Sequence, residues 1–170
     1  VYTRSLAAAL TGQGHEVTIF CQEPEPGRYA DLGRIVVPKI DHAVMPVYVA
    51  DTDYPGFQEA IALPDLVGDV RFDKYLFDWV GGVSAKAQAL GIQVIHANHM
   101  YHMPEVARRV KEAAGIPFIV YPHGSEIEYA LKVSEPLRLA ARNAVDAAAA
   151  LIVGNQSVTD RIWRLFPERE

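Results

Sequence analysis

The feature that most constrains the fold of this chain is a regular alternation of short apolar runs and amphipathic segments in its second half. Each apolar run has the length of a buried strand, and each following segment repeats its apolar residues at helical spacing. Strand, helix, strand, helix, strand, helix is the order of a doubly wound parallel sheet of the α/β class. The predicted strands are Ile92 to Ala97, Phe118 to Tyr121 and Ala149 to Val153, and the helices between and after them begin at Pro104, Ser134 and Ser157.

The helix that Pro104 opens has a predictable buried face and a predictable wet face. Its buried stripe is expected to hold Val106, Val110, Ala113 and Ala114. The wet face is expected to hold Arg108, Arg109 and Lys111, and Glu105 can form an ion pair with Arg109 four residues on. Other predicted features of these helices are a stop at Gly115 and a cap at Ser157.

The chain opens on half of a βαβ unit. Apolar residues from Tyr2 to Leu10 follow helical spacing, Gly12 stops the helix, and Glu16 to Phe20 is a short apolar strand. A right-handed crossover needs a parallel strand before such a helix. We therefore expect that residues 1–170 are a single domain from which the first strand and its loop have been removed.

The stretch between the two patterns is the least regular. Two short strands are predicted over Arg34 to Pro38 and Val44 to Val49, either as an antiparallel pair or as one sheet strand and one excursion. A polar turn over Asp51 to Pro55 follows. A helix is predicted from Phe72 to Leu90, and Gly81-Gly82 marks a point where it can kink.

Composition excludes several classes of protein. A chain of 170 residues with 50% hydrophobic and 22% charged residues is an ordinary globular domain. Its net charge of -5 argues against non-specific binding to nucleic acid. No apolar run approaches the roughly 18 residues that span a bilayer. Cys21 is the single cysteine and cannot form an internal disulfide, which favours a reducing, cytoplasmic compartment.

In doubly wound sheets ligands bind beyond the carboxyl ends of the strands. The first such loop contains three histidines at a spacing of three, His96, His99 and His102. Zinc accepts three imidazoles and a water in catalytic sites. However, His96 belongs to a strand and His99 to its tip, so the rings need not converge, and the loop has no carboxylate. We expect no metal, a hydrogen-bonded core role for His96, and either a ligand contact or a plain turn at His99.

The second loop, YPHGSE, has the sequence pattern that most clearly indicates a ligand site. His123 follows a buried strand and lies at the lip of the sheet, and Gly124 lets the backbone turn and a ligand approach closely. Ser125 and Glu126 offer a hydroxyl and a carboxylate, which are good partners for sugar hydroxyls. A helix that begins at Ser125 would turn its free N–H groups to the cleft. The alternative is that His123 only caps the turn.

The third loop offers Asn155, which either caps the following helix or faces the cleft.

The sequence does not contain the motifs that mark several other classes of enzyme. The sequence has no Gly-x-Ser-x-Gly elbow, no phosphate loop and no Gly-x-Gly-x-x-Gly that opens a helix. Cys21 has no evident activating partner.

Three segments resemble the N-terminal domain of retaining glycosyltransferases of family four, which have the GT-B fold with Rossmann-like halves. SLAAALTGQGHEVTIF, from Ser5 to Phe20, looks like the first helix and second strand of the family. IQVIHANH and GIPFIVYPHGSE lie within Gly91 to Glu126 and look like its third and fourth strands. NAVDAAAALIVGNQS, from Asn143 to Ser157, looks like its next helix, strand and serine-rich turn.

The resemblance implies a glycosyltransferase of hexosyltransferase type that uses a nucleotide-sugar as co-substrate and no other cofactor. It implies that His123 contacts the donor sugar at the reaction centre. The residues expected on the acceptor side, for a small-molecule, glycan or lipid acceptor, are His99, Tyr101, Gly124, Ser125, Glu126 and Asn155. The family's donor-binding domain would be a missing C-terminal part of the same chain, so we expect the fragment alone to be inactive.

Two other functions stay open at this point. One is a non-catalytic binding module on the same fold, because a fold does not fix an activity. The other is a metal-dependent hydrolase that uses the three histidines of the first loop. We expect a cytoplasmic protein that binds no nucleic acid, and contact with the inner face of a membrane stays open.

Overall fold

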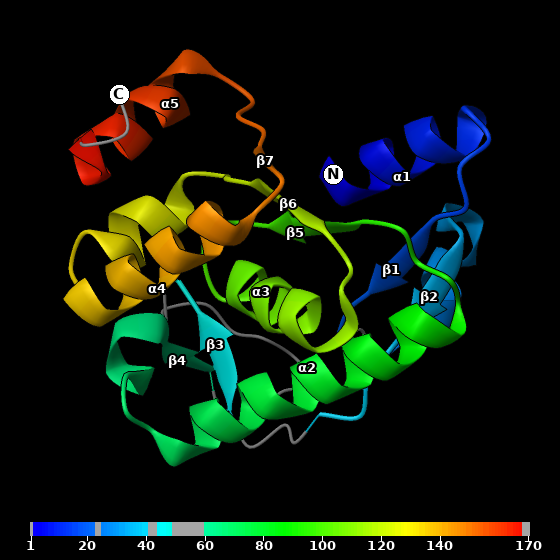
Figure 1. Ribbon diagram of the computed structural model, residues 1–170, viewed down its shortest axis with the longest axis horizontal. Helices are drawn as coiled ribbons and strands as arrows, with labels where there is room; N and C mark the ends of the chain where they lie inside the picture. Colours follow the sequence, from blue (N-terminus) through cyan, green and yellow to red (C-terminus); the bar gives the residue numbers. More distant parts are fainter. Residues whose placement is uncertain (1, 23–24, 41–43, 49–59, 168–170) are drawn as a thin grey trace. The chain divides into compact units, whose positions relative to one another are not determined.

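The computed structural model describes residues 2–22, 25–40, 44–48 and 60–167. They form two compact units, Val1–Lys39 and Ile40–Glu170, which we describe separately. Figure 1 traces the order of their helices and strands along the chain. The single domain over residues 1–170 stays a prediction.

The first unit contains α1 (Tyr2–Gly12), β1 (Thr18–Phe20), the 3-10 segment η1 (Pro26–Leu32) and β2 (Arg34–Val36). The strands β1 and β2 are parallel, with Thr18 opposite Arg34. The alternative in which the predicted strands over Arg34 to Pro38 and Val44 to Val49 form an antiparallel pair is therefore wrong, because each of them pairs in parallel with another strand.

Gly33 lets β2 start close beside β1. Its φ is +111°, and a Cβ added there would lie 2.8 Å from the carbonyl oxygen of Val17. A larger residue at this position would have to push the two strands apart.

The second unit starts with β3 (Met45–Val47), which pairs in parallel with β4 (Ala60–Ala62). The predicted turn over Asp51 to Pro55 lies outside the described residues. After η2 (Leu63–Leu66) comes α2 (Val70–Ala89), which is a single continuous helix through Gly81-Gly82. The side chain of Asp69 caps α2 by accepting from the N–H of Arg71.

The main sheet is built from β5 (Ile95–Asn98), β6 (Phe118–Tyr121) and β7 (Ala150–Leu151), in that order and all parallel. Ile95 lies opposite Phe118, and Ile119 lies opposite Ala150. This is the α/β class with parallel strands that the alternation of strands and helices predicts. The carboxyl ends of β5 and β6 meet at one edge, where the candidate loops begin.

Helix α3 (Met103–Ala114) packs on β5 and β6 and also contacts α2 and α4 (Glu135–Ala147) (Figure 1). Its buried face holds Val106, Ala107 and Val110. Ala113 is exposed, so that part of the prediction is wrong: the buried face includes Ala107 in its place, and Ala113 lies in the last turn of the helix. Gly115 ends the helix in the left-handed conformation, as predicted.

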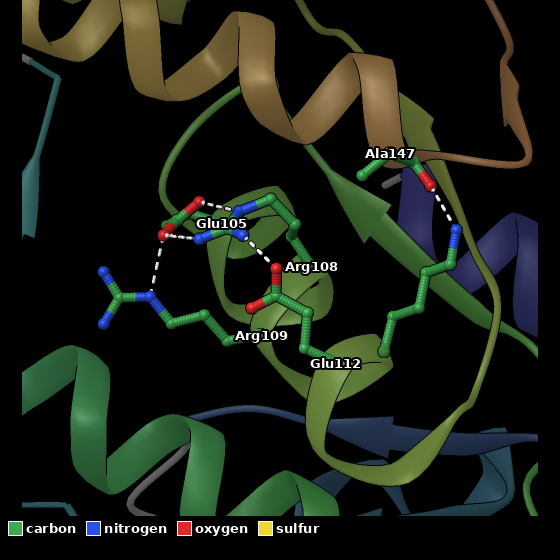
Figure 2. A network of polar contacts seen from close by, with 6 residues as sticks. Glu105, Arg108, Arg109, Glu112 and Ala147 are labelled. Atoms are coloured by element: carbon green, nitrogen blue, oxygen red, sulfur yellow. Dashed lines mark hydrogen bonds and ion pairs between the residues drawn. The ribbon is translucent and has the colours of Figure 1, made fainter.

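The polar face of α3 carries a network of ion pairs (Figure 2). Glu105 accepts from Arg108 and from Arg109, which confirms the predicted i,i+4 pair, and Arg108 also pairs with Glu112. The ammonium group of Lys111 donates to the carbonyl oxygen of Ala147 at 2.7 Å and so ties α3 to the end of α4.

Helix α5 (Gln156–Leu165) packs on the π-helical segment η3 (Ile127–Leu131). Its cap is Asn155, whose side chain accepts from the N–H of Val158 at 3.0 Å. The predicted cap at Ser157 is wrong, because the last residue with extended backbone is Asn155 and Ser157 already lies in the first turn. No helix in the described part of the chain is long and apolar enough to cross a membrane.

Candidate functional site

Two histidines from different loops meet at the carboxyl edge of the main sheet. His99 follows β5 and His123 follows β6, and their ring centroids lie 4.6 Å apart. The N–H of His99 donates to the carbonyl oxygen of Tyr121 at 2.8 Å, which extends the contact between the two strands into the loops. His99 has a φ of 67°, an uncommon backbone conformation for a residue with a side chain. Such conformations cluster at functional sites.

Each loop holds the imidazole of the other. The Oδ1 atom of Asn98, the last residue of β5, lies 3.0 Å from Nε2 of His123. The Oε2 atom of Glu126, from the β6 loop, lies 3.2 Å from Nδ1 of His99. The two rings are thus tied in a reciprocal pair of contacts, so that neither can turn without losing a partner on the other strand.

Glu126 is the buried anchor of this arrangement, with no surface exposed. Its Oε1 accepts from the N–H of His123 and its Oε2 from the N–H of Gly124, each at 2.9 Å. Burial alone would raise the pKa of Glu126. The hydrogen bond and charge of His99 and the backbone N–H groups outweigh burial and bring the pKa below its ordinary value. The carboxylate is therefore charged at neutral pH.

His123 is exposed at the edge of the sheet, and its ring is neutral at pH 7. Partial burial of the ring is the main cause that lowers the pKa of His123, and His99 lowers it further, against the opposing effect of Glu126. A neutral imidazole offers one N–H donor and one lone pair. That combination suits a ligand hydroxyl, which can donate and accept.

Aromatic rings frame the histidine pair. Tyr48 lies against His99, with ring centroids 4.7 Å apart, and Tyr121 lies against His123 at 5.2 Å. His96 stacks on Tyr121 at 5.8 Å. The hydroxyl of Tyr48 donates to the backbone carbonyl of Tyr101, which fixes the loop after β5 from the side.

The other predicted site residues lie in different surroundings. Gly124 is buried with a φ of +103°, and Ser125 begins the helical segment that precedes η3. Tyr101 is buried; its ring contacts Phe72, and its backbone rather than its hydroxyl reaches Tyr48. The side chain of Asn155 is engaged as the cap of α5. Whether any of these residues contacts a sugar stays a prediction.

The three histidines considered for a metal have separate neighbours. His96 stacks on Tyr121, His99 faces Glu126, and Nε2 of His102 lies 3.3 Å from the hydroxyl of Tyr75. Burial, with a smaller contribution from His99, lowers the pKa of His102 to about 3. The described residues contain no group of three or more His, Cys, Asp or Glu side chains that could hold a metal ion.

Sequence reasoning missed Asn98, Tyr48 and Tyr121 as parts of this site. Asn98 could have been found, because it is the last residue of a strand whose carboxyl end was already singled out. Tyr48 gave no signal, because its approach to His99 crosses about fifty positions of the sequence and depends on tertiary packing.

Comparison with known families agrees with the parallel α/β fold. The family model described as a glycosyl transferase 4-like domain matches residues 1–170. No curated protein matches the chain closely enough to count as a relative. Because the family model covers the whole sequence, the chain belongs to the glycosyl transferase 4-like domain family.

Proposed function

We propose that this domain is the acceptor side of a retaining glycosyltransferase, which moves a hexose from a nucleotide-sugar to an acceptor. The observation that carries the proposal is the neutral, exposed His123 at the carboxyl end of β6. Membership of the family supports sugar transfer in general. The proposal adds the donor class, the retaining outcome and the role of His123 as the residue that meets the donor sugar.

In this proposal the domain contributes mainly orientation. A rigid imidazole that hydrogen-bonds a sugar hydroxyl holds the reacting carbon close to the acceptor oxygen, and such positioning supplies a large share of rate acceleration. Stabilisation of the departing diphosphate is left to a donor-binding domain of the same protein. The transfer needs no metal ion, and chelation with EDTA should leave its rate unchanged.

The proposed partners follow from the same chemistry. The donor is a nucleotide-sugar, and the acceptor is a small molecule, a glycan or a lipid. We also propose a cytoplasmic location, because the single cysteine, Cys21, cannot form an internal disulfide, and with it contact at the inner face of a membrane when the acceptor is a lipid.

The proposal is tested with the protein that the complete gene encodes. A panel of nucleotide-sugars is screened for release of nucleoside diphosphate, and the anomeric configuration of the product is determined by NMR. His123→Ala should lower kcat/KM about 100-fold. His15→Ala is the control, since His15 is an exposed histidine of the first unit. Full activity of the His123→Ala enzyme would exclude the role of His123, and an inverted product would exclude the retaining outcome.

A second measurement tests the division of labour between domains. Residues 1–170 alone should transfer no sugar from the donor that the complete protein uses. Measurable transfer by this fragment would contradict the assignment of the donor site to another domain.

A further inference from the structure

We infer that Glu126 and Asn98 are positioning residues that fix the tautomers of His99 and His123 in opposite senses. Glu126 keeps a hydrogen on Nδ1 of His99, and Asn98 keeps a hydrogen on Nε2 of His123. In the neutral rings the lone pair then lies on Nε2 of His99 and on Nδ1 of His123. The two imidazoles of one site thus present different nitrogens as acceptors.

The argument for His99 starts from the hydrogen-bonding capacity of Glu126. An ionised carboxylate accepts hydrogen bonds and donates none. Glu126 is fully buried, and its two oxygens already receive the N–H groups of His123 and Gly124. The contact from Nδ1 of His99 at 3.2 Å is therefore favourable only when that nitrogen carries hydrogen. A carboxylate that fixes the tautomer of a histidine in this way is a recurring device of functional sites.

The argument for His123 rests on an independent contact. The Oδ1 atom of Asn98 is a carbonyl oxygen, and it faces Nε2 of His123 at 3.0 Å. An unprotonated Nε2 would place two lone pairs against each other, so Nε2 donates. Because Asn98 is the last residue of β5 and His123 lies in the loop after β6, the register of the two strands fixes both tautomers together.

The consequence for a ligand concerns His99, and it rests on the proposed function. The side chain of His99 is 31% exposed, and within the described residues its Nε2 has no hydrogen-bond partner. With hydrogen held on Nδ1, this Nε2 can accept a hydrogen bond. The ligand group that fits it is a hydroxyl that donates, as an acceptor sugar or alcohol supplies. Glu126 would then act through His99 instead of touching the sugar.

The tautomers are measured directly on the 170-residue chain without any ligand. Long-range ¹H–¹⁵N correlation spectra of the imidazoles are recorded at about pH 8, above the ordinary pKa of histidine. We expect a protonated Nδ1 and a bare Nε2 for His99, and the reverse for His123. Hydrogen on Nε2 of His99, or on Nδ1 of His123, would overturn the inference for that ring.

Variants separate positioning from general damage to the fold. In Glu126→Gln, an amide that can donate as well as accept replaces the carboxylate, so His99 should show a mixture of tautomers. The matched control is Glu128→Gln, which removes a carboxylate two residues away that pairs with Lys132. Asn98→Ala should free the tautomer of His123 and leave that of His99 unchanged. If Glu126→Gln does not fold, the wild-type spectrum and Asn98→Ala still decide the question.

Activity is the second readout, measured on the complete protein once its donor is known. Glu126→Gln should lower kcat/KM about tenfold, and Glu128→Gln should leave it unchanged. A tautomer change in Glu126→Gln with unchanged activity would contradict the role of His99 in ligand binding. Absence of sugar transfer by the wild type would contradict the proposed function alone, because the tautomers are measured without turnover.

Discussion

Two glutamates lie buried in different regions of the second unit, and they are held in different ways. Glu105, on α3, is 5% exposed and Glu126, at the edge of the sheet, is fully buried. Two arginines on the same helix donate to Glu105, Arg108 at 2.7 and 2.8 Å and Arg109 at 2.7 Å (Figure 2). Glu126 is held by two backbone N–H groups and by a histidine from another loop.

The difference concerns what each network can do. The partners of Glu105 are always charged and lie three and four residues away, so the network is local and stabilises one helix. The partners of Glu126 are a titratable ring and the N–H groups of a turn, brought together by two strands. Both carboxyls resist the rise in pKa that burial causes, but only the second network couples a charge to groups that a ligand can contact.

The largest expected effect tests which glutamate matters more for the fold. Glu126→Ala removes the acceptor of two backbone donors and of His99, and should lower the free energy of unfolding by about 3 kcal/mol. Glu105→Ala leaves Arg108 with Glu112 and Arg109 with water, and should cost about 1 kcal/mol. Urea unfolding at pH 7 measures both. Equal losses of unfolding free energy in the two variants would contradict the view that Glu126 matters more for the fold than Glu105.

The dependence of stability on pH should separate the contribution of His102 from that of Glu105. Below pH 6.5 the unfolded chain binds a proton at His102 that the folded chain refuses down to its pKa of about 3, so stability falls with falling pH through this window. Between pH 6.5 and 5 the loss should be about 2 kcal/mol. Glu105, whose pKa is lowered, contributes stability that is lost only as the pH falls below the ordinary glutamate range.

Urea unfolding at several pH values checks this assignment. His102→Gln should reduce the slope of the curve between pH 6.5 and 5, and His96 and His123, whose pKa values burial also lowers, account for the slope that stays. Glu105→Gln should leave that part unchanged. A flat wild-type curve above pH 5 would show that these histidines accept a proton as readily as in the unfolded chain.

Two glycines, one in each region, give a matched pair of substitutions. Gly124 has a φ of +103° and donates its N–H to Glu126, whereas Gly115 has a φ of +72° in the open space beyond α3. Gly124→Ala should cost about 2 kcal/mol and Gly115→Ala about 1 kcal/mol, because the backbone at Gly124 lies further from the left-handed region open to alanine. Thermal unfolding measures both, and the reverse order would contradict the view that the turn is the more strained place.

The smallest expected effect lies at the junction of α3 and α4. Lys111→Met removes the hydrogen bond to the carbonyl oxygen of Ala147 and should cost about 0.5 kcal/mol. Lys86→Met, in the last turn of α2, is the control for loss of a lysine near a helix end. A loss above about 2 kcal/mol for Lys111→Met would mean that the junction of α3 and α4 contributes as much to the free energy of unfolding as the edge of the sheet does.

The local sequence pattern was enough to predict most helices and strands of the second half of the chain. Phe118–Tyr121 is the strand that its apolar run predicts, and Gly115 ends α3 as a glycine in that position should. The start of α5 was not local in this sense: Asn155 and Ser157 are both good caps, and only the backbone decides which one is extended. Strand direction in the first half also needed the fold, because short strands carry no mark of parallel or antiparallel pairing.

The sequence by itself determined the parallel α/β class, pointed to the edge of the sheet where a ligand is expected, and gave His123 as the leading candidate there. Period and strand order are properties of neighbouring residues, so they can be read without coordinates. Only the tertiary structure decided that Glu126 faces inward, that Asn98 holds His123, and that Tyr48 packs on His99. These contacts join residues of different elements, and their geometry follows from the register of β5 on β6, which no local pattern specifies.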